Sequence, residues 1–252
     1  MRSAFVFDPA AVSGISGKYD LVHVSCLPFL CGMPFSEVER LRRVFSGNFP
    51  ENESTLSGGG PKFLLALPFI SRGRAFRLFA ERFPEALRTF DGFTLENIGD
   101  YEFLMSLFAE NKVNPANEYF LAGDTAFNVF NSETAEFWRG KLDSLAILPE
   151  LDPEEQKALA ERFPEGIVPE IVSCGTVPVM RSEHCFAVRG KNFRCGACGK
   201  YGLGGGCLRD VKGREFRVVT NPLDCNCVLL GNVNPREPEA YACGIFRTDV
   251  FA

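Results

Sequence analysis

Short apolar runs alternate with amphipathic segments between about residues 20 and 175, and this alternation restricts the fold more than any other feature. A near-continuous apolar run is typical of a strand that is covered on both faces. Such strands in alternation with helices predict repeated βα units around a parallel sheet. The predicted strands are SAFVFD (3–8), LVHVSC (21–26), KFLLALPF (62–69), DGFTLEN (91–97), EYFLAGD (118–124), SLAILPE (144–150) and EIVSCG (170–175).

Amphipathic segments fill the intervals between these runs and are predicted to be helices. Asp152, followed by Pro153 and two glutamates, combines a capping residue, a first-turn proline and acids that suit the helix dipole. The hexapeptide AERFPE occurs at 80–85 and again at 160–165, and we expect it to close a helix each time. The predicted helices are FSEVERLRRVF (35–45), RAFRLFAERF (74–83), GDYEFLMSLFAE (99–110), SETAEFWRGK (132–141) and DPEEQKALAERF (152–163).

Six of these strands are clear and the N-terminal run SAFVFD can add a seventh, whereas a standard closed (βα)8 barrel requires eight. The predicted architecture is therefore an α/β fold with an incomplete or distorted (βα) TIM-like barrel, closed by the Cys-rich C-terminal segment. An open, doubly wound sheet is the alternative. The expected domains are a barrel over residues 1–175 and a Cys-rich, metal-binding segment packed on it over residues 176–252.

Composition and charge narrow the classes of partner. The formal net charge is −5, so nucleic-acid binding is open but not favoured. No segment approaches the roughly 18 uninterrupted apolar residues of a transmembrane helix, and the N-terminus lacks a secretory pattern. We expect a cytoplasmic protein with a small-molecule substrate and no membrane partner. In a reducing compartment, ten cysteines favour metal ligands or buried thiols over disulfides.

Polar residues that end apolar runs are the candidate catalytic groups, because reactive side chains of a βα barrel lie at the carboxyl ends of its strands. The candidates are Asn97, Asp124, Asn131 and Glu150. Glu150 directly ends an apolar run, and Asn131 lies in a short NVFN turn beside Asp124. Helix capping or solvation of a loop is the alternative role for each of them.

Eight of the ten cysteines lie between Cys174 and Cys243, and their spacing predicts metal ligation. Thiolates select zinc, Cu(I) or iron–sulfur clusters, and two cysteines three apart can bind one centre from a tight turn. The predicted ligands are Cys185, Cys195 and Cys198, with either Cys225 or Cys227 as the fourth. The alternative is a set of small buried hydrophobic side chains, which suits Cys174 and Cys243 best.

Hydrolysis by a conventional catalytic triad has no support in the sequence. The chain has only two histidines, His23 and His184, and no G-x-S-x-G motif. His184 adjoins Cys185, and neighbouring side chains usually point apart, which is a poor arrangement for a cysteine–histidine pair.

Several blocks resemble the U32 family, historically called collagenase-like peptidases. They are IVPEIVSCGTVPVMRSEHC (167–185), CLRDVKGREFRVV (207–219) and DCNC (224–227) with the C-x-x-C, and LAGDTAFNVFNSETAEFW (121–138) and LAILPELDPEEQKAL (145–159) in the barrel half. The resemblance implies a (βα) barrel that carries a 4Fe-4S cluster. It also implies oxygen-independent hydroxylation of ubiquinone precursors or RNA bases, some of it with prephenate as oxygen donor.

Carried over by position, the resemblance assigns Cys185, Cys195 and Cys198 to the cluster. Pro178 stands where one subgroup has its first ligand, whereas another subgroup has proline there and recruits a cysteine near the N-terminus. Cys31 is the best counterpart here, so the fourth ligand is Cys31, Cys225 or Cys227. The chain is short at its N-terminal end compared with most relatives, which implies a hetero-oligomeric partner subunit.

Three functions are weighed on these grounds. The first is a cluster-dependent hydroxylase, or its subunit, acting on a small aromatic or nucleobase substrate. The second is an assembly protein with a structural zinc site made of the C-x-x-C and C-x-C pairs. The third is a U32-type peptidase, which ranks last because no nucleophile–base pair is visible in the sequence.

Overall fold

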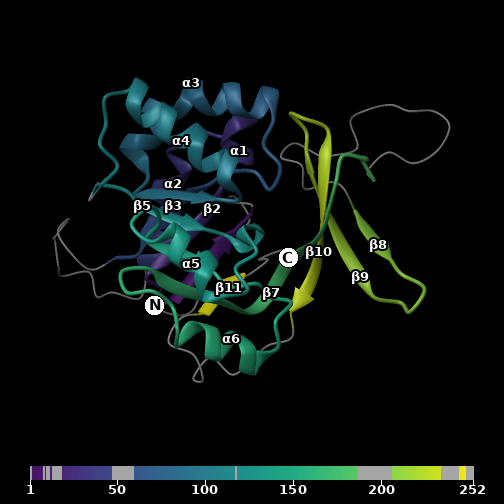
Figure 1. Ribbon diagram of the computed structural model, residues 1–252. Helices are drawn as coiled ribbons and strands as arrows, with labels where there is room; N and C mark the ends of the chain where they lie inside the picture. The colour runs from purple at the N-terminus through teal and green to yellow at the C-terminus, as the bar shows by residue number, and fades with distance from the viewer. Residues whose placement is uncertain are drawn as a thin grey trace, which may run out of the picture.

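A computed structural model describes residues 2–7, 9, 12, 19–46, 60–116, 118–186, 206–233 and 244–247 (Figure 1). The strands are β1 (Arg2–Val6), β2 (Leu21–Ser25), β3 (Lys62–Ala66), β4 (Gly92–Leu95), β5 (Phe120–Gly123), β6 (Ser144–Ala146), β7 (Val168–Ser182), β8 (Cys207–Arg209), β9 (Glu215–Asn221), β10 (Asn226–Val233) and β11 (Gly244–Arg247). The helices are α1 (Leu27–Leu30), α2 (Glu37–Ser46), α3 (Gly73–Thr89), α4 (Ile98–Glu110), α5 (Ser132–Trp138) and α6 (Pro153–Ala160), with a 3-10 turn η2 (Thr125–Phe127).

The sheet follows chain order from β1 to β7, and every neighbouring pair in that range is parallel. Strand β11 then pairs in parallel with both β1 and β7, so Ile245 lies opposite Ser3 on one side and Val172 on the other. The parallel strands therefore form a curled sheet whose two edges meet at β11. The predicted α/β fold with a TIM-like parallel sheet is confirmed at this level.

Strand β7 is long because it pairs first within the parallel barrel and then with an antiparallel ribbon of the same sheet. Its first half, to Gly175, pairs with β6 and β11, whereas Gly175 to Ser182 pair antiparallel with β10. Strands β10, β9 and β8 continue as an antiparallel ribbon that stands beside the barrel (Figure 1). The predicted division of the chain at residue 175 stays a prediction, and strand pairing runs across that point.

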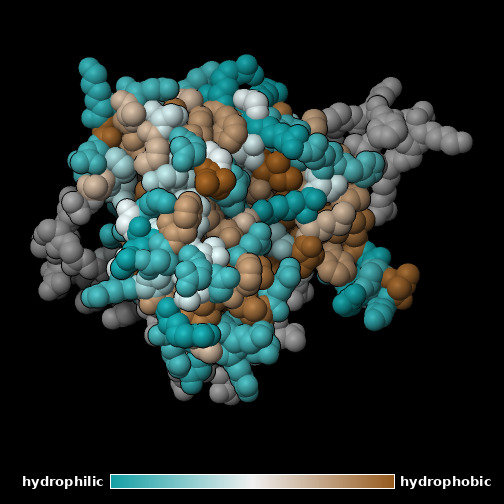
Figure 2. Space-filling view, viewed as in Figure 1, coloured by the Kyte–Doolittle hydropathy of each residue, from teal (hydrophilic) through white to brown (hydrophobic). Residues whose placement is uncertain are grey.

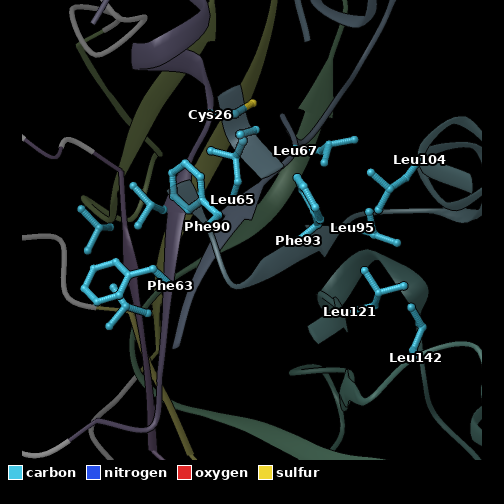
Figure 3. Close-up of a cluster of buried hydrophobic side chains, with 14 of the residues drawn as sticks. Cys26, Phe63, Leu65, Leu67, Phe90, Phe93, Leu95, Leu104, Leu121 and Leu142 are labelled. Carbon is cyan, nitrogen blue, oxygen red and sulfur yellow. The ribbon is translucent and has the colours of Figure 1, made fainter. Parts of the chain in front are cut away.

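Outward side chains of the parallel strands pack against the helices and form the main hydrophobic core (Figure 3). Phe63 and Leu65 of β3 and Phe93 and Leu95 of β4 contribute to it, each at most 1 % exposed. Helix α3 covers this layer with Ala75, Phe79, Phe83 and Ala86, which recur every three or four residues along one helical face.

Helix α3 corrects one sequence prediction. The first AERFPE hexapeptide does not close the helix, because α3 continues through Pro84 to Thr89. Proline removes one backbone donor inside a helix, but the packing of Phe83 and Ala86 on either side outweighs that loss. The second hexapeptide behaves as expected, since α6 ends at Ala160.

Side chains at the alternate, inward positions form separate small clusters inside the ring. Leu21, Leu64 and Ala122, with Phe120 against them, make the floor of the interior. Gly92 is required beside this floor, because a Cβ there would lie 2.0 Å from the Phe120 carbonyl oxygen. Inward side chains are therefore closely packed at the amino-terminal end of the strands.

The surface shows hydrophilic side chains with apolar ones in small separate groups on the face seen in Figure 2. Among the described helices, none combines the length and the apolar character needed to cross a membrane.

Candidate functional site at the carboxyl end of the barrel

Glu96 marks the carboxyl end of β4 as a charged site inside the fold. It is fully buried, and its Oε2 accepts a hydrogen bond of 2.7 Å from Arg181 Nη2 on the outer half of β7. The Arg181 guanidinium also lies over the Phe69 ring, 5.8 Å from its centroid. Arg181 is only partly buried, so this ion pair joins the barrel interior to the approach from solvent.

Asp100 adds a second buried carboxylate at the start of α4. Its Oδ2 accepts hydrogen bonds from the Glu96 backbone N–H at 3.0 Å and from Asn97 Nδ2 at 3.1 Å. Burial raises the pKa of Asp100 to about 6, and the two hydrogen bonds and the charge of Arg181 only partly offset that increase. Its Oδ1 has no hydrogen-bond partner among the described residues.

The four residues predicted to be catalytic all lie in loops that follow β4, β5 or β6. Asn97 caps α4 by accepting from Asp100 N, and Asn131 caps α5 by accepting from Thr134 N. Asp124 is 3 % exposed and accepts from Thr125 N at the start of η2. Glu150 is exposed in the turn before α6. Three of the four thus have capping contacts, and their catalytic role stays a prediction.

Cys185 and Cys227 are brought together where the outer half of β7 meets the start of β10. Cys227 is 1 % exposed, and its Sγ donates a hydrogen bond of 2.9 Å to the carbonyl oxygen of His184. Burial raises the pKa of the Cys227 thiol, and the charge of the nearby Cys185 raises it further. Cys225, two residues earlier, is exposed and has a left-handed backbone with φ of 56°.

Cys31 lies at the same end of the barrel, at the carboxyl terminus of α1. It is close enough to Cys26 to act on it electrostatically, and Cys26 is fully buried after β2. Burial raises the pKa of Cys26 well above its usual range, and the charges of Asp100 and Cys31 add to the increase. Cys26, Cys31 and Asp100 therefore share one region beside the Glu96–Arg181 pair.

The fit of these thiols to a metal centre is partial within the described part of the chain. Cys185 and Cys227 supply two neighbouring sulfur donors, but no group of three or more His, Cys, Asp or Glu side chains there is arranged to hold a metal. The predicted ligands Cys195 and Cys198 lie outside the described residues. A four-thiolate centre would need Cys195 and Cys198 in addition to Cys185 and one of Cys31, Cys225 or Cys227.

Sequence reasoning missed a polar network inside the barrel. His23 Nδ1 lies 2.7 Å from Thr94 Oγ1, and its Nε2 lies 3.7 Å from Glu170 Oε2. Ser3 Oγ donates to the same Glu170 oxygen at 3.0 Å. These residues come from β2, β4, β7 and β1, and each is at most 2 % exposed. The only signal was one polar residue at an alternate position of an otherwise apolar run, as in LVHVS.

The β9–β10 hairpin covers this interior from the carboxyl side. Val219, Val228 and Leu230 of the hairpin pack against Phe5, Phe7, Ala66 and Phe69 of the barrel end. These apolar side chains form a roof above the polar network, so His23 and Glu170 are shielded from water.

Asp224, in the turn of the hairpin, fixes the roof to the barrel. Its carboxylate accepts from the backbone N–H groups of Arg72, Arg74 and Ala75 at 3.1 to 3.4 Å, and so caps α3 from a distant part of the chain. Asn221 Nδ2 donates to the carbonyl oxygen of Ile70 at 3.3 Å. The cysteine-bearing turn is thereby attached to the loop that follows β3.

Comparisons with known proteins add little to this geometry. No protein-family model and no curated protein matches the chain. Among solved structures, the chain is similar to a protein provisionally described as a fructose-1,6-biphosphate aldolase from Coccidioides immitis, with 12% identity and a TM-score of 0.41. The match covers 68% of this chain and 63% of that one, so the chain spans less than two thirds of that structure. At this TM-score the likeness carries no argument about the site.

Proposed function

We propose that the chain is an iron–sulfur protein of the U32 family that serves oxygen-independent hydroxylation, or related redox chemistry, on a small aromatic or nucleobase substrate. The observation that carries the proposal is the approach of Cys185 to Cys227 at the carboxyl end of the barrel. The C-x-x-C of Cys195 and Cys198 follows Cys185 by only ten residues, within reach of the same centre.

In this proposal, Cys185, Cys195 and Cys198 hold the cluster with Cys31, Cys225 or Cys227. A bound cluster supplies one-electron transfer. Cys227 binds only after its thiol gives up the proton that it now donates to the His184 carbonyl. That requirement, together with the raised pKa, favours a more exposed thiol, Cys31 or Cys225, as the fourth ligand.

The mouth of the barrel supports the assignment of substrate to the same end. Arg181, near the end of β7, lies four residues before Cys185, and its partner Glu96 reaches the interior. A compound held near Arg181 would therefore lie between the cysteine pair and the interior. Asn97, Asp124, Asn131 and Glu150 remain the proposed polar contacts around that position.

Metal and acid-labile sulfide analysis tests the proposal, on protein purified without oxygen and with a visible spectrum recorded. We expect iron and sulfide near four each per chain, as a 4Fe-4S cluster requires. Cys185→Ser should lose most of both. Cys207→Ser is the matched control, because Cys207 is an exposed thiol on β8 outside the proposed ligand set, and this variant should keep them.

One other outcome of this measurement, and one of a separate peptide-hydrolysis assay, would favour the other two functions. Stoichiometric zinc without sulfide would contradict the redox proposal and favour an assembly protein with a structural site. Peptide hydrolysis that survives Cys185→Ser would favour a peptidase. The peptidase is the weaker candidate, because Thr94, whose hydroxyl lies beside a histidine, is 1 % exposed inside the barrel.

A further inference from the structure

We propose that the barrel interior beneath the β9–β10 hairpin is a binding site for a small, uncharged molecule with a hydroxyl or amino group. Glu170 and Ser144 are its direct hydrogen-bonding contacts, and His23 is the buried neighbour of Glu170. The site is separate from the cysteine centre and does not depend on the function proposed above.

Two buried polar atoms in the barrel interior have unused hydrogen-bonding capacity. Glu170 Oε1 and Ser144 Oγ are buried and have no hydrogen-bond partner among the described residues. Glu170 is 2 % exposed and Ser144 is 0 % exposed. Leaving such groups unpaired costs about 1–3 kcal/mol each, and more for a charged group. A ligand or ordered water that donates to Glu170 removes that cost.

Several inward side chains of the barrel are smaller than those that usually fill such an interior. The interior of a parallel barrel is ordinarily filled by branched residues such as valine, isoleucine and leucine. Here β3, β5 and β6 carry Ala66, Ala122, Ser144 and Ala146 at their inward positions, and all four are buried. Small side chains above the floor of Leu21 and Leu64 suit an interior that binds a small ligand.

The charged side chains around the interior favour an uncharged ligand. Among the described residues, the buried carboxylates of Glu96, Asp124 and Glu170 lie at or just beyond the inward positions of β4, β5 and β7, near the guanidinium of Arg181 and the imidazole of His23. An anion would meet net repulsion there and would lose its hydration beneath an apolar roof. A neutral donor keeps the hydrogen bond without either cost.

Within the site, the proton positions follow from the hydrogen bonds. Ser3 donates to Glu170 Oε2, which leaves Oε1 to accept from the ligand. His23 lies between Thr94 and Glu170, so its ring is close enough to respond when a ligand forms a hydrogen bond to Glu170. Glu170 is the hydrogen-bond acceptor in this arrangement.

The experiment uses the nitrogen and proton NMR signals of His23. Because the chain has only two histidines, His184→Gln leaves His23 as the single imidazole. The probes are 1-butanol, its isomer methyl propyl ether, which lacks a donor, and butyrate, which is an anion. We expect saturable shifts of the His23 signals with butanol, binding at least tenfold weaker for the ether, and none with butyrate.

Glu170→Gln should weaken butanol binding about tenfold or more and leave the ether unchanged, whereas Glu161→Gln, an exposed carboxylate on the outer surface, should change neither. If Glu170→Gln does not fold, butanol binding to Ser144→Ala tests the second proposed hydrogen bond to the ligand. Equal binding of butanol and ether, or no saturable shift with any probe, would overturn the proposal. Metal analysis of the same samples keeps this outcome separate from that of the cysteine centre.

Discussion

Single side chains at the carboxyl end of the barrel show how far residue patterns predict a site. Asn97, Asp124 and Asn131 were predicted to be catalytic from their position after a strand, and each has the contact of a helix cap. Ser3, His23, Thr94 and Glu170 gave little signal in the sequence. Their importance depends on which strands become neighbours, and no local pattern contains that information.

Asp100 gives a prediction at this scale. Its pKa of about 6, raised by burial from 3.8, means that the folded protein binds a proton more tightly than the unfolded chain between pH 4 and 6. Stability is therefore lost as pH rises through that window, by about 3 kcal/mol in all. Asp100→Asn should abolish this dependence and raise stability at pH 7 by about 1–2 kcal/mol.

Urea unfolding at pH 4, 5, 6 and 7 measures the effect of Asp100→Asn. The difference between variant and parent should grow from pH 4 to pH 6 and then level off. Glu161→Gln, an exposed carboxylate, serves as control and should follow the parent throughout. A constant difference at all four pH values would show that Asp100 is not the titrating group.

At the scale of elements, periodicity predicted six strands and five helices of the βα pattern and offered the N-terminal run as a seventh strand, and the structure has an element at each place. The antiparallel ribbon β8 to β10 was read as a metal-binding segment rather than as strands, because the interpretation followed the spacing of its cysteines, such as Cys225 and Cys227, rather than its apolar runs. Strand β11 was missed, since four residues after a cysteine-rich stretch carry no periodic signal.

The β9–β10 hairpin gives a prediction at the element scale. Asp224→Ala removes the cap of α3 and one attachment of the roof, so stability should fall by about 1–2 kcal/mol. Hydrogen exchange should rise in the hairpin and in the first turn of α3. Asp152→Ala is the matched control, because Asp152 caps α6 within its own sequence. It should cost a similar amount and leave exchange in the hairpin unchanged.

At the scale of the whole molecule, closure of the parallel sheet depends on β11. The sequence predicted a barrel with a missing strand, and the structure supplies that strand from the C-terminal segment, hydrogen-bonded on both sides. Composition could not reveal this, because the connection between β7 and β11 passes through the whole antiparallel ribbon. Local propensity cannot specify a pairing between residues 3 and 245, whose separation only tertiary packing overcomes.

Ile245→Pro tests closure. Proline removes a backbone donor from a strand that has neighbours on both sides, so the variant should lose about 3 kcal/mol or more, or become insoluble. Val211→Pro is the control, since Val211 is fully exposed in the turn between β8 and β9, where proline is tolerated. Thermal unfolding of both variants measures the difference, and equal melting temperatures would contradict closure by β11.

The position of β11 also determines when the parallel sheet can close during synthesis. Strand β1 leaves the ribosome first, but its outer edge waits for a partner that lies about 240 residues later in the chain. At ordinary rates of translation that interval is roughly 10 to 50 seconds. During it, β1 presents an open edge, and β7 presents a second one from its own synthesis until that of β11. Neighbouring nascent chains can pair with either edge. A cell that makes this protein must therefore keep the open edges of the incomplete sheet from pairing with neighbouring nascent chains. When many ribosomes translate one message, the yield of folded protein should fall more than it does for a barrel closed by strands that are near in sequence.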